Sequence, residues 1–114
     1  MTLTAGLTNT ASYTVTDDMS PPHLPMKVLS TPHMIQLIEG TCLMLAQNHL
    51  ADDQTTVGTH VCVSHAAAAH SGEEVKVDCE LIEVDRRRLE FRTSVTKGDT
   101  VVSEGTHQRF IVGR

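Results

Sequence analysis

Residues 30–49 have the sequence STPHMIQLIEGTCLMLAQNH, and this stretch decides the fold. Ser30-Thr31-Pro32 predicts the start of a helix, because a Thr side chain can cap free backbone N–H groups and Pro suits the first helical position. We expect the helix to run to about His49, where Ala51-Asp52-Asp53 ends it. Apolar residues cover more than half of its circumference when successive residues are rotated by about 100°. A helix with this pattern is enclosed by the rest of the fold.

The residues that follow the helix alternate between apolar and polar side chains, which predicts strands. The clearest case is residues 74–81, in which one face consists of Val75, Val77, Cys79 and Leu81. The alternation slips at Ile82, which predicts a β-bulge there. The other predicted strands are residues 57–65, 89–95 and 101–112, with tight turns at residues 85–87 and 97–99.

Before the helix, the sequence predicts one strand and one irregular loop. Residues 10–16 alternate modestly, whereas residues 17–25 contain three prolines and cannot form regular structure throughout. Residues 1–9 are candidates for disorder. One buried helix among successive antiparallel strands is typical of the α+β class, with a sheet of about five strands curled around the helix. The length of 114 residues fits a single domain, residues 1–114.

The composition excludes several classes of function. The net charge of −5 argues against a nucleic-acid backbone as the main partner. No apolar run is long enough for a transmembrane helix, and residues 1–16 lack the features of a secretory signal. Three Cys residues without tight spacing are typical of free thiols, so we expect a cytoplasmic protein that does not bind membranes. A small domain buries only about 65% of its unfolded surface, so pairing of two copies would stabilise it.

Glu39 is the first candidate for chemistry, because it lies on the apolar side of the predicted helix near Ile35, Cys42 and Leu43. A carboxylate buried there is costly unless it is paired or hydrogen-bonded. No neighbouring helical position carries a group that could neutralise it, so a buried Glu39 would be a usable base near neutral pH. The alternative is a Glu at the edge of the apolar side that reaches water or a subunit interface.

His65 and Thr31 are the next candidates. His65 ends the apolar face that starts at Val57, and four alanines follow it. Small side chains such as Ala66 and Ala67 let an extended ligand approach the backbone, although a lone His on an apolar face is more often a core residue. Capping of the helix is a sufficient role for Thr31, but a hydroxyl beside free N–H groups is also suited to stabilising an oxyanion.

Two further clusters have alternative interpretations. His60, Cys62, His65 and His70 suggest a metal site, but strand alternation puts His60 and Cys62 on the face opposite His65, so we expect no metal. The triplet Arg86-Arg87-Arg88 fits a solvated hairpin tip or a site for a phosphate group of a bulky cofactor. The sequence contains no Gly-rich phosphate loop, nucleophile elbow or CxxC pair.

Four stretches, with their order and spacing, carry a resemblance to a known family. They are residues 31–39 (TPHMIQLIE), 56–67 (TVGTHVCVSHAA), 87–89 (RRL) and 105–109 (GTHQR). In these stretches, and over residues 28–112 as a whole, the chain resembles the hotdog-fold thioesterases of the fluoroacetyl-CoA thioesterase type. The resemblance implies a long helix wrapped by a curved antiparallel sheet, in a homodimer or a tetramer with sites at the subunit interface.

The same resemblance implies hydrolysis of an acyl-CoA thioester to a carboxylic acid and a free thiol. CoA is then part of the substrate, and no other cofactor is expected. The family's catalytic set falls on Thr31, Glu39 and His65, and its close backbone contact with the acyl-thioester falls on Gly58. The further candidates for substrate binding are Ala66, Ala67 and Arg87.

One departure from the family concerns the loop before the helix. The fluoroacetyl-specific enzyme has Phe residues there that form a hydrophobic lid, whereas residues 22–30 contain no Phe. We therefore expect a general acyl-CoA thioesterase rather than one specific for the fluorinated substrate. The alternative is a non-catalytic hotdog dimer that binds an acyl-CoA or a related ligand. A hotdog dehydratase or hydratase fits less well, because the Asp and His pair that it would need is missing.

Overall fold

The structure, a computed structural model, describes residues 2–114; Met1 lies outside the described residues. In chain order the elements are β1 (Thr8–Thr14), a short 3₁₀ helix (Asp17–Met19), α1 (Thr31–Gln47), β2 (Gln54–Val63), β3 (Glu74–Asp85), β4 (Arg88–Lys97) and β5 (Thr100–Gly113). No helix within residues 2–114 is long and apolar enough to cross a membrane.

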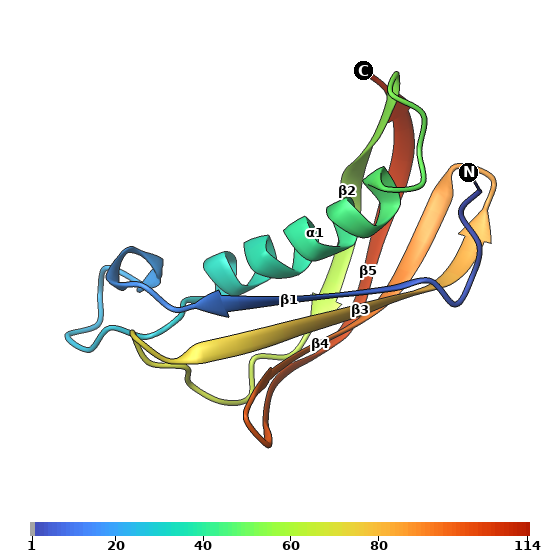
Figure 1. Cartoon of the computed structure of the whole chain (residues 1–114). Coiled ribbons are helices and arrows are strands. Elements are labelled where there is room, and N and C mark those ends of the chain that lie inside the picture. Colours follow the sequence, from blue (N-terminus) through green and yellow to red (C-terminus); the bar gives the residue numbers. More distant parts are fainter. Residues whose placement is uncertain (1) are drawn as a thin grey trace.

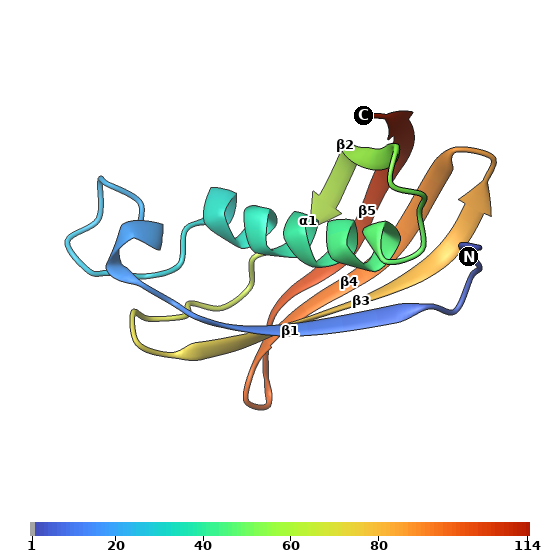
Figure 2. The same ribbon diagram turned by 45° about the horizontal axis from the view of Figure 1, so that its top comes forward.

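The five strands form one antiparallel sheet in the order β1-β3-β4-β5-β2. Figures 1 and 2 show this sheet curving around α1, with the Pro-rich loop beside the start of the helix and the β3–β4 turn beyond its other end. β2 pairs with β5 and forms the edge of the sheet opposite β1. The predicted α+β architecture, with one helix and a curled five-stranded sheet, is confirmed.

The helix begins at Thr31 as predicted, but its cap is Ser30 rather than Thr31. The Ser30 hydroxyl accepts a hydrogen bond from the backbone N–H of His33 at 3.2 Å. α1 ends at Gln47, two residues before the predicted end. Because Ser30 caps the helix, the Thr31 hydroxyl is available for another contact.

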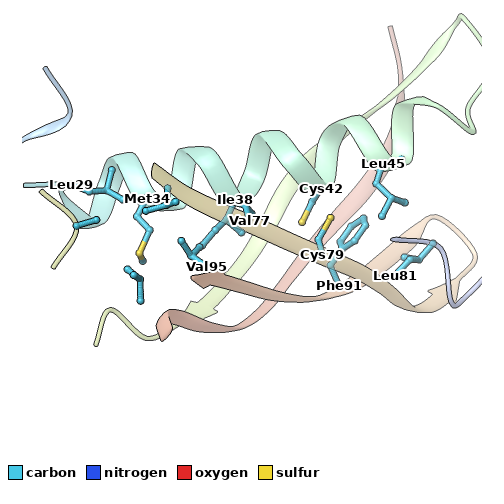
Figure 3. Close-up of a cluster of buried hydrophobic side chains, with 14 of the residues drawn as sticks. Leu29, Met34, Ile38, Cys42, Leu45, Val77, Cys79, Leu81, Phe91 and Val95 are labelled. Atoms are coloured by element: carbon cyan, nitrogen blue, oxygen red, sulfur yellow. The ribbon is translucent and has the colours of Figure 1, made fainter. Parts of the chain in front are cut away.

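The core lies between α1 and the inward face of the sheet, as Figure 3 shows. The helix contributes Met34, Ile38, Cys42 and Leu45, and the strands contribute inward rows that include Val77, Leu81, Phe91 and Val95. The predicted alternation of residues 74–81 and 89–95 is therefore confirmed. The register of β3 against β4 shifts between Leu81 and Glu83, which is the bulge predicted at Ile82.

Two of the three free cysteines meet in this core. Figure 3 shows the sulfur atoms of Cys42 on α1 and Cys79 on β3 close together. The hydrogen bond with the Cys79 thiol, together with burial, raises the pKa of Cys42. Cys42 is therefore an unreactive thiol that packs like a small apolar residue.

β2 departs from the predicted alternation near its middle. Its register against β5 shifts between Gly58 and His60. As a result Thr56 is buried, with 4% of its surface exposed, whereas Val57 is 47% exposed. The prediction that Val57 shares the inward face with Val61 is wrong, because one extra residue moves the preceding side chains to the opposite face.

The N-terminal segment is more regular than predicted. β1 begins at Thr8, and the residues just before it also bind the Leu81 backbone. The N–H of Gly6 donates to the Leu81 carbonyl, and the N–H of Leu81 donates to the Leu7 carbonyl, each at 2.8 Å. The expectation of disorder is therefore wrong for the segment from Gly6 to Asn9, since pairing with β3 orders it.

Candidate active site

Thr31 and His65 lie in contact, although 34 residues separate them in the chain. Thr31 is the first residue of α1, and His65 follows the end of β2 by two residues. Thr31 Oγ1 and His65 Nδ1 are 2.7 Å apart. With the ring proton on Nε2, the Thr31 hydroxyl donates to Nδ1, which is the arrangement in which an imidazole can take a proton from a hydroxyl.

The same helix start offers one free backbone donor. Pro32 has no N–H, the His33 N–H donates to the Ser30 hydroxyl, and the Met34 N–H donates to the Ser30 carbonyl. Among the residues that the structure describes, the Thr31 N–H has no such partner. It lies at the positive end of the helix, where a negative oxygen is stabilised.

Thr31 and His65 line a cavity of about 470 Å³. The Pro-rich loop and the start of α1 form one wall, and the segment after β2 forms the other, in which Ala66, Ala67 and Ala68 follow His65. The loop side is mostly apolar, with Pro21, Leu24, Val28 and Leu29. Ala66 and Ala67, which were candidates for substrate binding, thus line the same cavity as His65, and its mostly apolar wall suits an apolar group.

Glu39 does not join Thr31 and His65 within the chain. It lies eight residues beyond Thr31 on α1, which corresponds to about 12 Å along the helix axis. Its side chain is 38% exposed, and its Oε2 accepts a hydrogen bond from Arg109 Nη1 at 3.4 Å. The expectation of a buried Glu39 is therefore wrong, whereas the alternative, a Glu at the edge of the apolar side that reaches water, agrees with this exposure. Its cation comes from a strand that is distant in the sequence.

Arg109 on β5 is the centre of a buried polar network. Its Nε donates to the Thr56 hydroxyl at 2.7 Å, and its Nη2 donates to the Thr56 carbonyl at 3.0 Å. Only 5% of Arg109 is exposed, and this burial lowers its pKa, while the Glu39 carboxylate acts in the opposite direction. Two of the three guanidinium nitrogens of Arg109 thus bind Thr56, and the third, Nη1, donates to Glu39.

His107 completes this network. Its Nδ1 lies 2.8 Å from the His60 carbonyl, which can only accept, so Nδ1 carries the proton. Its Nε2 then accepts from Arg109 Nη1 at 3.1 Å, and the ring is neutral. Burial lowers the pKa of His107, in agreement with this form. The ring also stacks on Phe91, with 6.2 Å between centroids.

Gly58 on β2 lies in close contact with the carboxylate of Glu39 on α1. A Cβ at this position would collide with Glu39 Oε2 and would lie 3.3 Å from both Arg109 Nη1 and His107 Cε1. Gly58 was a candidate for contact with the acyl-thioester. In this chain its missing side chain makes room for the carboxylate of Glu39.

Arg87 lies away from Thr31 and His65 in the same chain. It occupies the turn between β3 and β4, at the opposite end of α1 from Thr31, and lines a different cavity. His107 and Arg109 are functional candidates that the sequence alone does not indicate. The available signal was their spacing, since two residues that are two apart on a strand share one face. No local pattern indicates that this face meets Glu39.

The sequence of the chain matches a described family over nearly its whole length. The family of fluoroacetyl-CoA-specific thioesterases matches residues 9–114. The fluoroacetyl-CoA thioesterase of Streptantibioticus cattleyicolor is 35% identical over 86 residues, which are 75% of this chain and 62% of that protein. The chain therefore spans less than two thirds of the length of this curated relative.

Solved structures agree with this family and with the hotdog fold. The structure of the fluoroacetyl-CoA thioesterase FlK superposes with a TM-score of 0.92 and 29% identity, covering 98% of this chain and 90% of that chain. A Thermus thermophilus member of the thioesterase superfamily superposes with a TM-score of 0.88 and 18% identity, over 96% of this chain and 84% of that chain. The fold is therefore a hotdog fold, and the chain belongs to the fluoroacetyl-CoA-specific thioesterase family.

Proposed function

We propose that this protein hydrolyses acyl-CoA thioesters to a carboxylic acid and free CoA. The observation that carries the proposal is the 2.7 Å contact between the Thr31 hydroxyl and the His65 imidazole in an apolar cavity. A hydroxyl, an imidazole and a helix N-terminus beside a space for an acyl group are the elements that acyl transfer needs. Membership of the thioesterase family supports the same reaction.

In this mechanism His65 takes the proton of the oxygen nucleophile, which is either the Thr31 hydroxyl or a water bound to it. The new C–O bond forms at the thioester carbonyl, and the Thr31 N–H stabilises the negative oxygen. The C–S bond then breaks and CoA leaves as a thiolate, which takes up the proton held by His65. With water as the nucleophile this step releases the acid. With Thr31 as the nucleophile, His65 next takes a proton from a water that attacks the acyl-Thr31 ester, the bond from the carbonyl carbon to Thr31 Oγ1 breaks, and Thr31 Oγ1 takes up that proton. Overall, one water supplies hydroxide to the acid and a proton to the thiol.

The active form is proposed to be a homodimer joined through the β2 edges. Both edge strands lack Lys, Arg, Asp, Glu and Pro, but β2 (Gln54–Val63) is the longer one, with ten residues against seven in β1. Edge strands that face water usually carry such residues, because they prevent pairing with other chains. Val57 on this edge is also 47% exposed. These features support pairing with a second copy.

Glu39 is proposed to act in the site of the partner subunit. Within one chain it is about 12 Å along the helix from Thr31 and bonds to Arg109 instead of His65. A twofold axis that pairs the two β2 edges runs the two helices in opposite directions, so Glu39 of the partner subunit can approach Thr31 and His65. Each site then contains a hydroxyl and an imidazole from one copy and a carboxylate from the other.

The first test measures CoA release from acetyl-, fluoroacetyl-, butyryl- and hexanoyl-CoA. We expect the parental protein to release CoA, and His65→Ala and Glu39→Gln each to lower turnover at least about tenfold. His49→Ala and Glu74→Gln are matched controls outside the site. Saturable binding of acyl-CoA without thiol release would support the non-catalytic dimer and overturn the proposal.

The second test mixes two inactive variants, Thr31→Ala and Glu39→Gln. If the carboxylate comes from the partner, each mixed dimer contains one intact site, and random mixing restores roughly a quarter of the parental activity. If all three groups act within one chain, no mixed dimer contains an intact site and activity stays at the level of the variants. Sedimentation of the purified protein as a monomer at the assay concentration would overturn both the dimer and the shared site.

The proposed location is the cytoplasm. Acyl-CoA thioesters are formed inside cells, and the three free cysteines suit a reducing compartment.

A further inference from the structure

A second cavity, of about 590 Å³, lies at the turn between β3 and β4. Asp85, Arg86, Arg87, Arg88 and Phe110 line it, so three guanidinium groups and one aromatic ring surround the same space. The cavity shares no residue with the one that contains Thr31 and His65.

Two of these three arginines are unpaired. The acidic side chains near the turn all bind Arg88: Glu83 forms an ion pair with it, Glu90 lies 3.4 Å away and Asp85 lies 4.0 Å away. Arg86 and Arg87 are exposed and make no ion pair within residues 2–114. Two guanidinium groups are thus free to bind phosphate oxygens, for which their forked geometry is suited.

The backbone holds both arginines in place. Arg86 has a φ of +56° and is the one non-glycine residue among those described with a positive φ. This conformation disfavours any side chain with a Cβ, so an Arg at this position has a cost that a Gly would not have. The carbonyl of Arg87 accepts a hydrogen bond from the Ile111 N–H at 2.9 Å, which fixes the turn to β5. The turn is therefore a fixed support for its side chains.

Phe110 adds an aromatic surface. It is one of two Phe residues in the chain, and it is 41% exposed, whereas Phe91 is fully buried. Its partner in β4 is Arg88, so the ring lies beside the arginine turn. Free guanidinium groups next to an exposed ring can bind phosphates and stack on a base, which together describe a nucleotide.

The position of this cavity along β2 indicates which of the two active sites a ligand bound in the cavity can reach. Phe110 pairs with Val57 near the start of β2, whereas His65 lies just beyond its end at Val63. The six residue steps from Val57 to Val63 extend over about 20 Å, so the two cavities of one chain lie far apart. In an antiparallel pairing of two β2 edges, the start of one β2 lies beside the end of the other. Neighbouring strands are about 4.8 Å apart, so the partner's β5 and β4 lie roughly 10 to 15 Å from His65.

We infer that Arg86, Arg87 and Phe110 bind the nucleotide end of the acyl-CoA whose thioester lies at Thr31 and His65 of the partner subunit. The inference rests on the proposed function and on the proposed pairing of the β2 edges. The phosphates of CoA bind Arg86 and Arg87, its adenine stacks on Phe110, and the pantetheine arm spans the distance between the two chains.

The test compares two substrates that carry the same acyl group, an acyl-CoA and an acyl-pantetheine, which lacks the nucleotide. The ratio of their kcat/KM values measures recognition of the nucleotide. We expect the double variant Arg86→Ala/Arg87→Ala to lower this ratio about tenfold or more, because each lost charged hydrogen bond weakens binding by that order. Arg92→Ala is the matched control, since Arg92 is an exposed arginine on β4 whose ion pair is with Glu80 at 2.8 Å. An unchanged ratio in the double variant would overturn the inference and leave thioester hydrolysis intact.

A mixing experiment tests whether the arginines act across the interface. Thr31→Ala is mixed with Arg86→Ala/Arg87→Ala, and the mixed dimer keeps one active Thr31, in the chain that lacks the arginines. If the nucleotide binds to the partner, this site retains the parental ratio, because the partner has both arginines. A ratio equal to that of the double variant would place the arginines and Thr31 in the same chain and would overturn the inference.

A binding measurement separates this inference from the proposed reaction. Calorimetry with adenosine 3′,5′-bisphosphate requires no hydrolysis, and we expect Arg86→Ala/Arg87→Ala to weaken its binding about tenfold or more. Absence of thiol release together with intact bisphosphate binding would refute the reaction and retain the nucleotide site. Equal bisphosphate affinity in the parental protein and the double variant would refute the nucleotide site.

Discussion

Gly58 on β2 leaves the space that the carboxylate of Glu39 on α1 occupies. A Cβ at residue 58 would collide with Oε2 of Glu39, and the neighbouring Arg109 and His107 lie 3.3 Å from the same point. Because Oε2 is the end of a flexible side chain, a larger residue at position 58 would displace the carboxylate, so the glycine allows Glu39 its present position. Glu39 is held between this glycine and Arg109, with a defined position at the surface of the chain.

Replacement of Gly58 by Ala should displace Glu39 and lower activity. A shift of about 1 Å in a catalytic group lowers turnover by up to about a hundredfold, so we expect a decrease between about tenfold and a hundredfold in kcat/KM. Gly113→Ala is the control, because the nearest atom to its added Cβ would be 4.0 Å away. Parental activity in Gly58→Ala would mean that the position of Glu39 does not matter for the reaction.

Replacement of Arg109 by Lys should lower both stability and activity. A lysine ammonium cannot bond at once to the hydroxyl and carbonyl of Thr56 and to Glu39, as the guanidinium does. We expect a loss of about 2–4 kcal/mol in the free energy of unfolding, measured with urea, because buried polar groups lose their partner. The exposed Arg92→Lys should change it by less than about 0.5 kcal/mol. Equal effects of the two substitutions would contradict the assigned role of Arg109.

The capping residue and the candidate catalytic residue can be separated by two neighbouring substitutions. Ser30→Ala removes the side chain that accepts the His33 N–H and should cost about 1 kcal/mol of stability. Thr31→Ala removes the hydroxyl that contacts His65, so it should lower turnover at least about tenfold with a smaller effect on thermal unfolding. The opposite pattern, with stability lost at residue 31 and activity at residue 30, would contradict this division.

Stability should fall as the pH falls below about 6.5, because His107 is neutral in the folded protein. Burial lowers the pKa of His107 below the ordinary value of a histidine, about 6.5, and the ring faces Arg109, Glu39 and the His60 carbonyl. Between the folded and unfolded pKa values the unfolded chain binds the extra proton, so the free energy of unfolding increases with pH in this window. Urea unfolding across this window measures the slope, which should be smaller in His107→Asn. The Asn amide can still donate to the His60 carbonyl but cannot titrate, so an unchanged slope would assign the effect to another group.

The apolar cavity beside Thr31 should favour acyl groups longer than acetyl. Each additional methylene that is buried adds about 0.8 kcal/mol, or roughly fourfold in kcat/KM, until the cavity is filled. We expect butyryl-CoA to exceed acetyl-CoA, and Ala67→Phe to shift the preference to the shorter chain, because Ala67 lines the cavity. Rates for the series of acyl-CoAs measure this trend. A preference for acetyl-CoA in both proteins would show that these walls do not bind the acyl chain.

Much of the fold follows from local patterns in the sequence. The alternation of Val75, Val77, Cys79 and Leu81 and the helical spacing of Met34, Ile38 and Cys42 indicate which side chains face the core, and the structure buries all of them. Such patterns are local, since burial of one face imposes a period of about 2 on a strand and about 3.6 on a helix. The bulge at Ile82 can be predicted from the same alternation, because the apolar positions continue beyond it with a shift of one residue.

The tertiary structure alone decided the surroundings of Glu39. Its cation, Arg109, lies 70 residues away in the chain, and periodicity within an element carries no information on which faces meet. The bulge after Gly58 lies in a strand in which Thr56 alone is buried, so the shift in register is not visible in the apolar pattern. Ser30 and Thr31 are both suitable caps by residue type, and the contact of Thr31 with His65, across 34 residues, decided between them. Local chemistry thus set the elements and their inward faces, whereas long-range packing chose the partners of each polar side chain.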